Sequence, residues 1–310
     1  DELPKKGILL LSYAMSRLRH TEILYWTPQC IILDEALIQN KSTTALNMIM
    51  LGKLAEERIL ASGSLVNNGP LNLYYPLHVS EPSLVGGSFT KFADYFTDPK
   101  LKKKILERTS YGNTPDPEHL DELKSIVQAT SIIMRKEAVM EHLPKPITEI
   151  VPVEMPPEYE ELERNIRSNW VLEIPGHTPV FLENPLEVHS RIAQLSAGFF
   201  YIEEDGRKLP WFLDEQPKID RFIAHACESS DRGIVWFRYR AQGIALQERL
   251  DREGIPYLFV DGSTKNVSQV VQEFNSNPKF KYLLAQERVL NYGQTIMGSE
   301  ESIFPGMTST

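Results

Sequence analysis

An α/β protein built on parallel sheets is the fold that this 310-residue sequence predicts. In the first and last thirds of the chain, short apolar runs alternate with helix-length amphipathic segments, a pattern typical of βαβ units. Between these two parts, long charged segments with helical spacing predict helices that are inserted between sheet-based cores. The hydrophobic content of 42% and the charged content of 24% are ordinary for a globular protein.

The first third, residues 1–87, is expected to contain strands and helices in alternation. Ser42 is a good helix N-cap, and Gly63 interrupts the last apolar run. The expected elements are a buried strand in GILLLSY (7–13), a helix in AMSRLRHTEILYW (14–26), a strand in QCIILDEA (29–36), a helix in STTALNMIMLGKLAEE (42–57) and a strand in RILASGS (58–64).

Residues 88–204 are expected to form a helical insertion and connecting region. Long helices are predicted over 88–110 and 117–143, then a strand and a helix over 144–169, and a helix and hairpin over 187–208. Residues 205–310 are expected to form a second α/β part. Its strands are predicted in 233–239, 255–262, 279–286 and 301–306, with helices in 240–254 and 266–277.

Composition excludes several classes of protein. The apolar runs are far shorter than the roughly 20 residues that span a membrane, and the N-terminus has no basic start of secretory type. Cys30 and Cys227 are the only cysteines, which favours reduced packing residues in a cytoplasmic protein. The net charge of −9 argues against a protein wrapped in nucleic acid, although a local basic groove remains compatible with it.

The acidic pair Asp34–Glu35 ends an apolar run and is the first candidate for chemistry. A carboxylate at the end of a buried strand is costly unless it has a partner or a task there. One interpretation is that the pair caps the start of a helix. The other is a metal-and-water site, since phosphoryl transfer from a nucleotide needs a magnesium ion and a positioned water.

Several segments in order resemble the Swi/Snf-like branch of the superfamily-two helicase ATPases, of phage or bacterial type. The sequence DEALIQNKS (34–42) is similar to the family's acidic box, and RILASGSLVNNGP (58–70) to its Thr-Gly-Thr-Pro coupling motif. The other matching segments are ILLLSYAMSRL (8–18), SIIMRKEAVMEHLPKP (131–146), the stretch 217–277 that resembles the opening of the second lobe, and YLLAQERVLNYGQTI (282–296), which resembles motif V.

This resemblance implies two RecA-like lobes, ATP and Mg²⁺ as cofactors, and DNA, duplex or single-stranded, as the partner, together with other replication, repair or remodelling proteins. It implies that Asp34 binds the metal and that Glu35 is the base for hydrolysis. It places Ser62, Gly63 and Ser64 in the coupling motif. The nucleic-acid contacts that it implies are Lys41, Arg135, Lys136, Gln286, Arg288 and Gly293. The sequence alone also allows a plain strand-end turn at 62–64 and a solvated helix face at 135–136.

The sequence departs from the family pattern at several positions. It contains no Gly-x-x-x-x-Gly-Lys-Ser/Thr phosphate loop, and we expect the chain to be truncated before that loop and after motif V. Leu37 and Gln39 replace the family's His and Lys. Ser62, Ser64 and Leu65 replace Thr, Thr and Pro, and motif V reads GQTI (293–296). The alternative is therefore a degenerate, non-catalytic two-lobe module that binds DNA or a partner protein.

Overall fold

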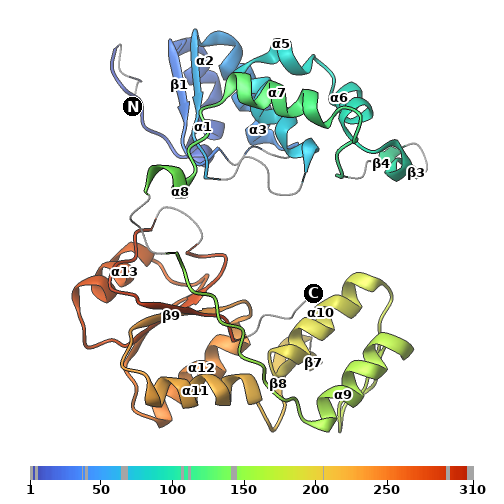
Figure 1. The fold of residues 1–310 in the computed structure, drawn as a ribbon, viewed down its shortest axis with the longest axis vertical. Coiled ribbons are helices and arrows are strands. Elements are labelled where there is room, and N and C mark those ends of the chain that lie inside the picture. Colours follow the sequence, from blue (N-terminus) through green and yellow to red (C-terminus); the bar gives the residue numbers. More distant parts are fainter. Residues whose placement is uncertain are drawn as a thin grey trace. The chain divides into compact units, whose positions relative to one another are not determined.

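The computed structural model divides the chain into two compact units, residues 1–146 and 147–310 (Figure 1). Residues 88–204, expected as one insertion, are shared between these units, and the division at 87 and 204 stays a prediction. The structure describes residues 3, 6–36, 38, 41–63, 69–105, 108–110, 113–140, 145–204, 206–290 and 294–305.

The first unit combines a small parallel sheet with many short helices. In order, its elements are α1 (Tyr13–Leu18), α2 (His20–Trp26), β1 (Cys30–Leu33), α3 (Thr43–Leu54), β2 (Glu57–Leu60), η1 (Pro70–Leu73), α4 (Tyr74–Ser80), α5 (Pro82–Val85), α6 (Phe89–Phe96), η2 (Pro99–Leu101), β3 (Lys103–Ile105), β4 (Arg108–Ser110), α7 (Leu120–Thr130) and α8 (Lys136–Val139).

Strands β1 and β2 pair in parallel through the crossover helix α3, which confirms a βαβ unit. The register places Cys30 opposite Glu57 and Leu33 opposite Leu60. As predicted, Ser42 caps α3, because its hydroxyl accepts a hydrogen bond from the Ala45 N–H at 3.1 Å.

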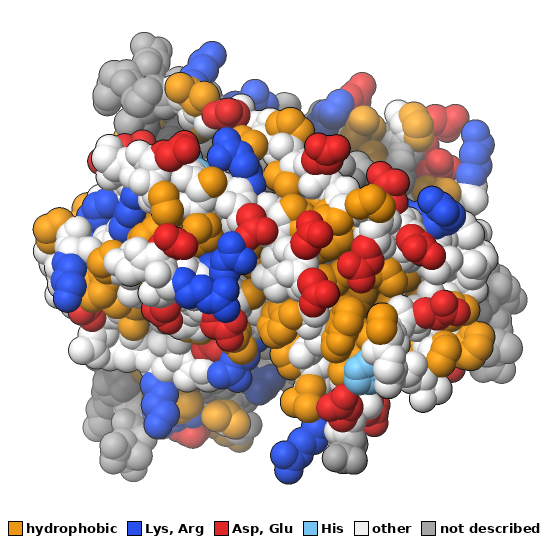
Figure 2. All heavy atoms as spheres, turned by 90° about the horizontal axis from the view of Figure 1, so that it is seen from below, with side chains coloured by type: hydrophobic (Ala, Val, Ile, Leu, Met, Phe, Trp, Pro, Cys, Tyr) orange, Lys and Arg blue, Asp and Glu red, His pale blue; other side chains and the backbone are white. Residues whose placement is uncertain are grey.

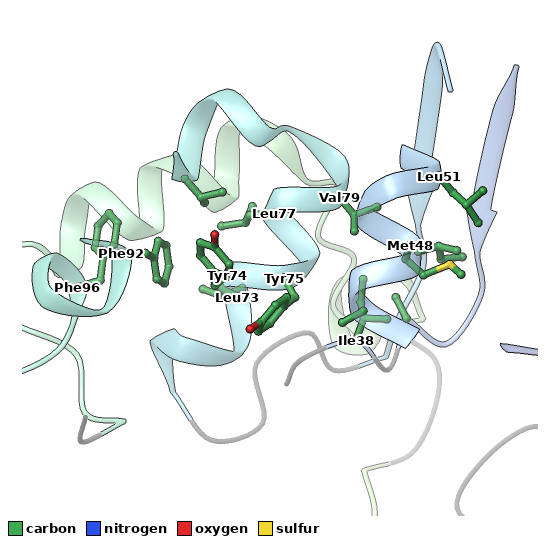
Figure 3. Packing of buried hydrophobic residues seen from close by; sticks show 14 of the residues in the cluster. Ile38, Met48, Leu51, Leu73, Tyr74, Tyr75, Leu77, Val79, Phe92 and Phe96 are labelled. Atoms are coloured by element: carbon green, nitrogen blue, oxygen red, sulfur yellow. The ribbon is translucent and has the colours of Figure 1, made fainter. Parts of the chain in front are cut away.

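Helix α4 joins the two halves of the core of this unit (Figure 3). On one side Tyr74 packs against Phe92 of α6, with ring centroids 5.4 Å apart. On the other side Val79 lies toward Met48 and Leu51 of α3 (Figure 3). Aromatic and aliphatic burial of this kind stabilises the unit and fixes the helices that carry the small sheet.

The second unit contains a larger sheet and a helical subdomain before it. In order, its elements are α9 (Pro157–Arg164), the π-helical turn η3 (Asn165–Asn169), β5 (Val171–Leu172), β6 (Val180–Phe181), α10 (Pro185–Ser196), β7 (Phe199–Glu204), β8 (Arg207–Phe212), α11 (Pro217–Glu228), β9 (Gly233–Phe237), α12 (Arg240–Arg252), β10 (Tyr257–Val260), α13 (Val267–Ser276), β11 (Tyr282–Gln286) and β12 (Glu301–Ile303).

The larger sheet has the strand order β10-β11-β9-β12, and every neighbouring pair is parallel. Side chains alternate between its two faces. Val235 and Leu284 pack with α11 and α12, whereas Ile234 and Leu283 pack with α13. Helices therefore cover both faces, as a parallel sheet requires, and the α/β prediction is confirmed.

Four predictions of secondary structure are wrong. The strand predicted ahead of the helix within 144–169 does not form, since residues 145–156 have no regular secondary structure before α9. Residues 7–11 form no strand, and Ile8 and Leu10 are exposed while Leu9 and Leu11 pack on the core. The helix predicted over 88–110 ends at Phe96, and the one predicted over 117–143 ends at Thr130. Both cysteines are exposed, so neither is a packing residue. Within the described residues, no helix has the length and apolar character needed to cross a membrane.

Candidate functional site

The acidic pair lies in a tight turn at the carboxyl end of β1. The strand ends at the buried Leu33; Asp34 is exposed and Glu35 half-buried. The Asp34 Oδ1 atom accepts a hydrogen bond from the Glu35 backbone N–H at 3.0 Å, and Glu35 has a left-handed φ of 46°. The pair does not cap a helix, because Ser42 fills that role at the start of α3.

The ends of β1 and β2 bring the acidic turn beside the predicted coupling motif. The Ala61 N–H donates to the Leu33 carbonyl at 2.8 Å, and the Ala36 N–H donates to the Ala61 carbonyl at 2.9 Å. Ser62 and Gly63 follow Ala61 directly. The two motifs, about 28 residues apart in sequence, therefore meet at one edge of the sheet, because carboxyl ends of parallel strands share an edge.

Tyr13 is a member of this site that sequence reasoning missed. Tyr13 is the first residue of α1, and its hydroxyl donates a hydrogen bond of 2.9 Å to the Asp34 backbone carbonyl. Burial, and then the negative charges of Asp34 and Glu35, raise the pKa of Tyr13, so the phenol stays a neutral donor. The only signal in the sequence was an aromatic residue after the apolar run 8–11, which is too common to predict this contact.

The acidic turn suits a hard divalent cation of the Mg²⁺ class. Mg²⁺ is commonly bound through one or two protein carboxylates, with water and phosphate oxygens completing its octahedron. Asp34 is exposed and supplies carboxylate oxygens, and Glu35 lies next to it. Among the residues that the structure describes, no group of three or more His, Cys, Asp or Glu side chains forms a closed protein cage. Asp34 and Glu35 could therefore supply at most two carboxylate ligands to such an ion.

The carboxyl edge of the second sheet is organised by Gln286, at the end of β11. Its Oε1 atom accepts a hydrogen bond from the Gly262 N–H at 3.0 Å, and its Nε2 atom donates to the Arg238 carbonyl at 3.3 Å. Gln286 therefore ties together the loops that follow β9, β10 and β11. The exposed cations at this edge are Arg238, Lys265 and Arg288 on these loops, and Arg240 at the start of α12.

Asp261 is the buried charge of this second edge and was also missed by sequence reasoning. Its Oδ1 atom accepts hydrogen bonds from the Ser263 N–H at 2.9 Å and hydroxyl at 2.6 Å, and its Oδ2 atom lies 3.1 Å from the Arg240 Nε atom. Burial alone would raise the pKa of Asp261, but the Ser263 bonds, the Arg240 charge and Thr264 together lower it. The carboxylate stays ionised and shapes the loop after β10.

Curated proteins similar to this chain come from vertebrates. A DNA repair and recombination protein RAD54-like from Gallus gallus is 24% identical over 90% of this chain and 42% of its own length. The Danio rerio protein of the same description is 26% identical over 90% of this chain and 41% of its own length. With the order of motifs, these relatives support a Swi/Snf-like helicase family. The chain spans about two fifths of their length, and no family model matches it.

Solved structures similar to this chain include two from Sulfolobus solfataricus. The SWI2/SNF2 ATPase core in complex with dsDNA has 19% identity and a TM-score of 0.35, and covers 89% of this chain and 57% of its own. The ATPase core domain alone has 17% identity and a TM-score of 0.38, and covers 89% and 56%. TM-scores below 0.5 do not establish a shared fold.

The other residues implied by the Swi/Snf-like resemblance are placed as follows. Lys41 is exposed beside Ser42, and Arg135 is exposed just before α8, which begins at Lys136. In the part of the first unit that is described, neither Lys41 nor Arg135 is linked by a hydrogen bond or ion pair to the edge formed by β1 and β2. Ser64 and Gly293 lie outside the described residues. The roles of all these residues, and of Arg288, stay predictions.

Proposed function

We propose that this chain is part of a Swi/Snf-like, ATP-dependent DNA translocase that moves on or remodels nucleic acid. The observation that carries the proposal is that the acidic box and the coupling motif meet at one edge of the sheet. There the N–H of Ala36, which follows Glu35, donates a hydrogen bond to the carbonyl of Ala61, which precedes Ser62. The RAD54-like relatives support DNA as the partner, since their description names DNA repair and recombination.

In this proposal the acidic turn handles the nucleotide. Glu35 orients and deprotonates the attacking water, and the carboxylate of Asp34 holds the metal. Mg²⁺, when bound, neutralises charge on the nucleotide phosphates. The backbone bond between Ala36 and Ala61 links the acidic turn to Ser62–Gly63, and we propose that a change at the nucleotide reaches the coupling motif through this link.

In this proposal the exposed cations at the carboxyl edge of the second sheet bind the DNA backbone. The exposed cations are Arg238, Lys265 and Arg288 on adjacent loops and Arg240 at the start of α12. Gln286 links these loops through its bonds to Gly262 and Arg238. Exposed guanidinium and ammonium groups bind phosphates without reading sequence. We propose the RecA-like lobes at 1–87 and 205–310, the connecting region at 88–204, and an intracellular setting with replication, repair or remodelling proteins as further partners.

Turnover of ATP with and without duplex DNA tests this function. It is measured on the natural polypeptide that carries residues 1–310. We expect DNA to stimulate turnover and Glu35→Gln to lower kcat by about 10²–10⁴-fold, because it removes the base. Glu57→Gln is the matched control, since this exposed carboxylate lies at the other end of the same sheet. Equal turnover by Glu35→Gln and the parent would contradict the assignment.

A second candidate function is a non-catalytic two-lobe module that binds DNA or a partner protein. It is favoured by Leu37 and Gln39, which replace the family's His and Lys. Because residues 1–310 contain no phosphate-loop motif, we expect no turnover from them alone. Absence of turnover in the natural polypeptide as well, with DNA binding retained, would select the module.

A further inference from the structure

The helical subdomain before the second sheet presents a face that the proposed ATP and DNA chemistry does not use. Helices α9 and α10, the turn η3 and strand β5 share one core, which includes Tyr159, Ile166, Leu172 and Leu195. Figure 2 shows apolar and acidic side chains side by side on the underside of this region. We give the name acidic–apolar face to the exposed glutamates and large apolar side chains between residues 154 and 186 of this subdomain: Glu154, Glu158, Glu160, Glu161, Glu173, Val180, Phe181, Glu183 and Leu186.

The large apolar side chains of this face are exposed because a neighbouring residue fixes the backbone. Leu182 is buried in the core, and its N–H donates to the Trp170 carbonyl at 2.8 Å, which fixes the β5–β6 ladder. The neighbouring Phe181 is 75% exposed, and Leu186, in the first turn of α10, is 78% exposed. Exposed apolar side chains mark an interaction site where they form a patch with a polar surround, and Phe181 and Leu186 supply the two large apolar side chains here.

The charge of this region is strongly negative. Residues 154–187 contain eight glutamates and two arginines, within a chain whose total net charge is −9. Glu163 is paired with Arg167, and Glu187 accepts bonds from the Glu183 N–H and the Asn184 amide at the start of α10. The remaining six glutamates are exposed and make no ion pair with any residue that the structure describes.

We infer that the acidic–apolar face is a docking surface for a basic polypeptide segment with large apolar side chains. A nucleic acid is excluded as the occupant because its phosphates would meet unpaired carboxylates. A symmetric pairing with a second copy would place the same carboxylates opposite one another, which is unfavourable. A segment with Lys or Arg around Leu, Phe or Trp can pair its cations with the glutamates and pack its apolar side chains against Phe181 and Leu186.

Binding of synthetic peptides to the full chain tests this inference by fluorescence anisotropy. The probe is a labelled amphipathic peptide of Lys and Leu, compared with a Lys/Ser peptide and a Glu/Leu peptide of equal length. We expect the Lys/Leu peptide to bind at least about tenfold more tightly than either control, since it supplies both charge and apolar anchors. Equal binding of either control peptide, or no binding of the Lys/Leu peptide, would overturn the inference.

Substitutions of exposed residues test whether the Lys/Leu peptide binds at the acidic–apolar face. The double variant Phe181→Ser, Leu186→Ser should weaken the Lys/Leu peptide about tenfold, because it removes the apolar anchors. The triple variant Glu158→Lys, Glu160→Lys, Glu161→Lys should also lower the affinity for the Lys/Leu peptide. The affinity that remains should depend less on salt concentration. The matched controls are Met297→Ser, which is 63% exposed, and Glu253→Lys with Glu273→Lys, both exposed on the same unit.

Circular dichroism verifies that each variant is folded, and all the altered side chains are exposed. Unchanged peptide affinity in the double variant would contradict this location. Sedimentation velocity supplies a further check: a dimer that disappears in Phe181→Ser, Leu186→Ser would show that the face binds a second copy and would overturn the inference. This inference does not depend on ATP turnover, so it fails or succeeds separately from the proposed function.

Discussion

At the scale of single residues, Asp261 shows how a buried carboxylate is kept charged beside a cationic edge. The side chain is almost completely buried, yet Ser263, Thr264 and Arg240 surround its two oxygens. An unsatisfied buried charge would be strongly destabilising, whereas one that accepts several hydrogen bonds is tolerated. Asp261 therefore fixes the loop after β10 and presents the Arg240 guanidinium at the edge.

Replacing Asp261 by Asn is expected to destabilise the chain by about 1–3 kcal/mol at neutral pH, because the amide loses the charge-assisted bonds. The pKa of Asp261 is lower in the folded state than in the unfolded state, so its stabilisation is present above roughly pH 4 and declines as the pH falls below that. Urea unfolding of parent and variant from pH 7 to pH 3 measures the difference.

Asp214→Asn is the control for this prediction, since Asp214 is exposed in the same unit. Its unfolding free energy should change by less than about 0.5 kcal/mol. A gap between Asp261→Asn and the parent that stays constant down to pH 3 would contradict the role assigned to the charge.

At the scale of elements, the strongly periodic segments were predictable and the segments that depend on distant partners were not. The strands β9, β10 and β11 follow from short apolar runs bounded by turns, and α12 ends where Gly254 takes a left-handed φ of 64°. Pro99 cannot continue a helix, so α6 stops before it. Residues 7–11 have strand composition, but an apolar run does not specify which partner it will find.

The candidate site was predictable to the same extent. Asp34 and Glu35 stand out because they end an apolar run, and parallel strands then place the 62–63 turn beside them. The Tyr13 hydroxyl bond to Asp34 and the Asp261–Arg240 pair join residues 21 positions apart in each case. Neither position has a sequence motif of its own, so only the folded chain reveals these contacts.

The packing of α12 on β9 gives a prediction at the scale of elements. A Cβ atom added at Gly243 would lie 2.8 Å from the Phe237 ring. We expect Gly243→Ala to destabilise the chain by about 1–3 kcal/mol through overpacking, although Ala is the better helix former. Thermal or urea unfolding measures this loss.

A second substitution distinguishes the clash from a general effect on the helix. Combining Gly243→Ala with Phe237→Leu should cost less than the two single changes added together, because the smaller side chain relieves the contact. Ile244→Ala, at an exposed neighbouring position, is the control. Strict additivity of the two changes would show that Phe237 is not the cause.

At the scale of the whole molecule, positive and negative side chains are unevenly distributed along the chain. The chain is acidic in total, yet the carboxyl edge of the second sheet has exposed cations, while the region 154–187 is rich in glutamate. A protein that moves on DNA needs the first feature to hold phosphates, whatever its net charge. Residues 1–310 can be tested for this property directly, without requiring the phosphate loop that their sequence lacks.

The most direct measurement is the affinity of residues 1–310 for duplex DNA as a function of salt. We expect the affinity to fall steeply with salt, with a slope of about −0.9 for each phosphate contacted. Arg288→Ala should reduce that slope by about 1, whereas Lys279→Ala, an exposed cation before β11 at the opposite end of the sheet, should leave it unchanged. An affinity that does not depend on salt, or no binding of duplex DNA, would contradict the proposal that this chain works on DNA.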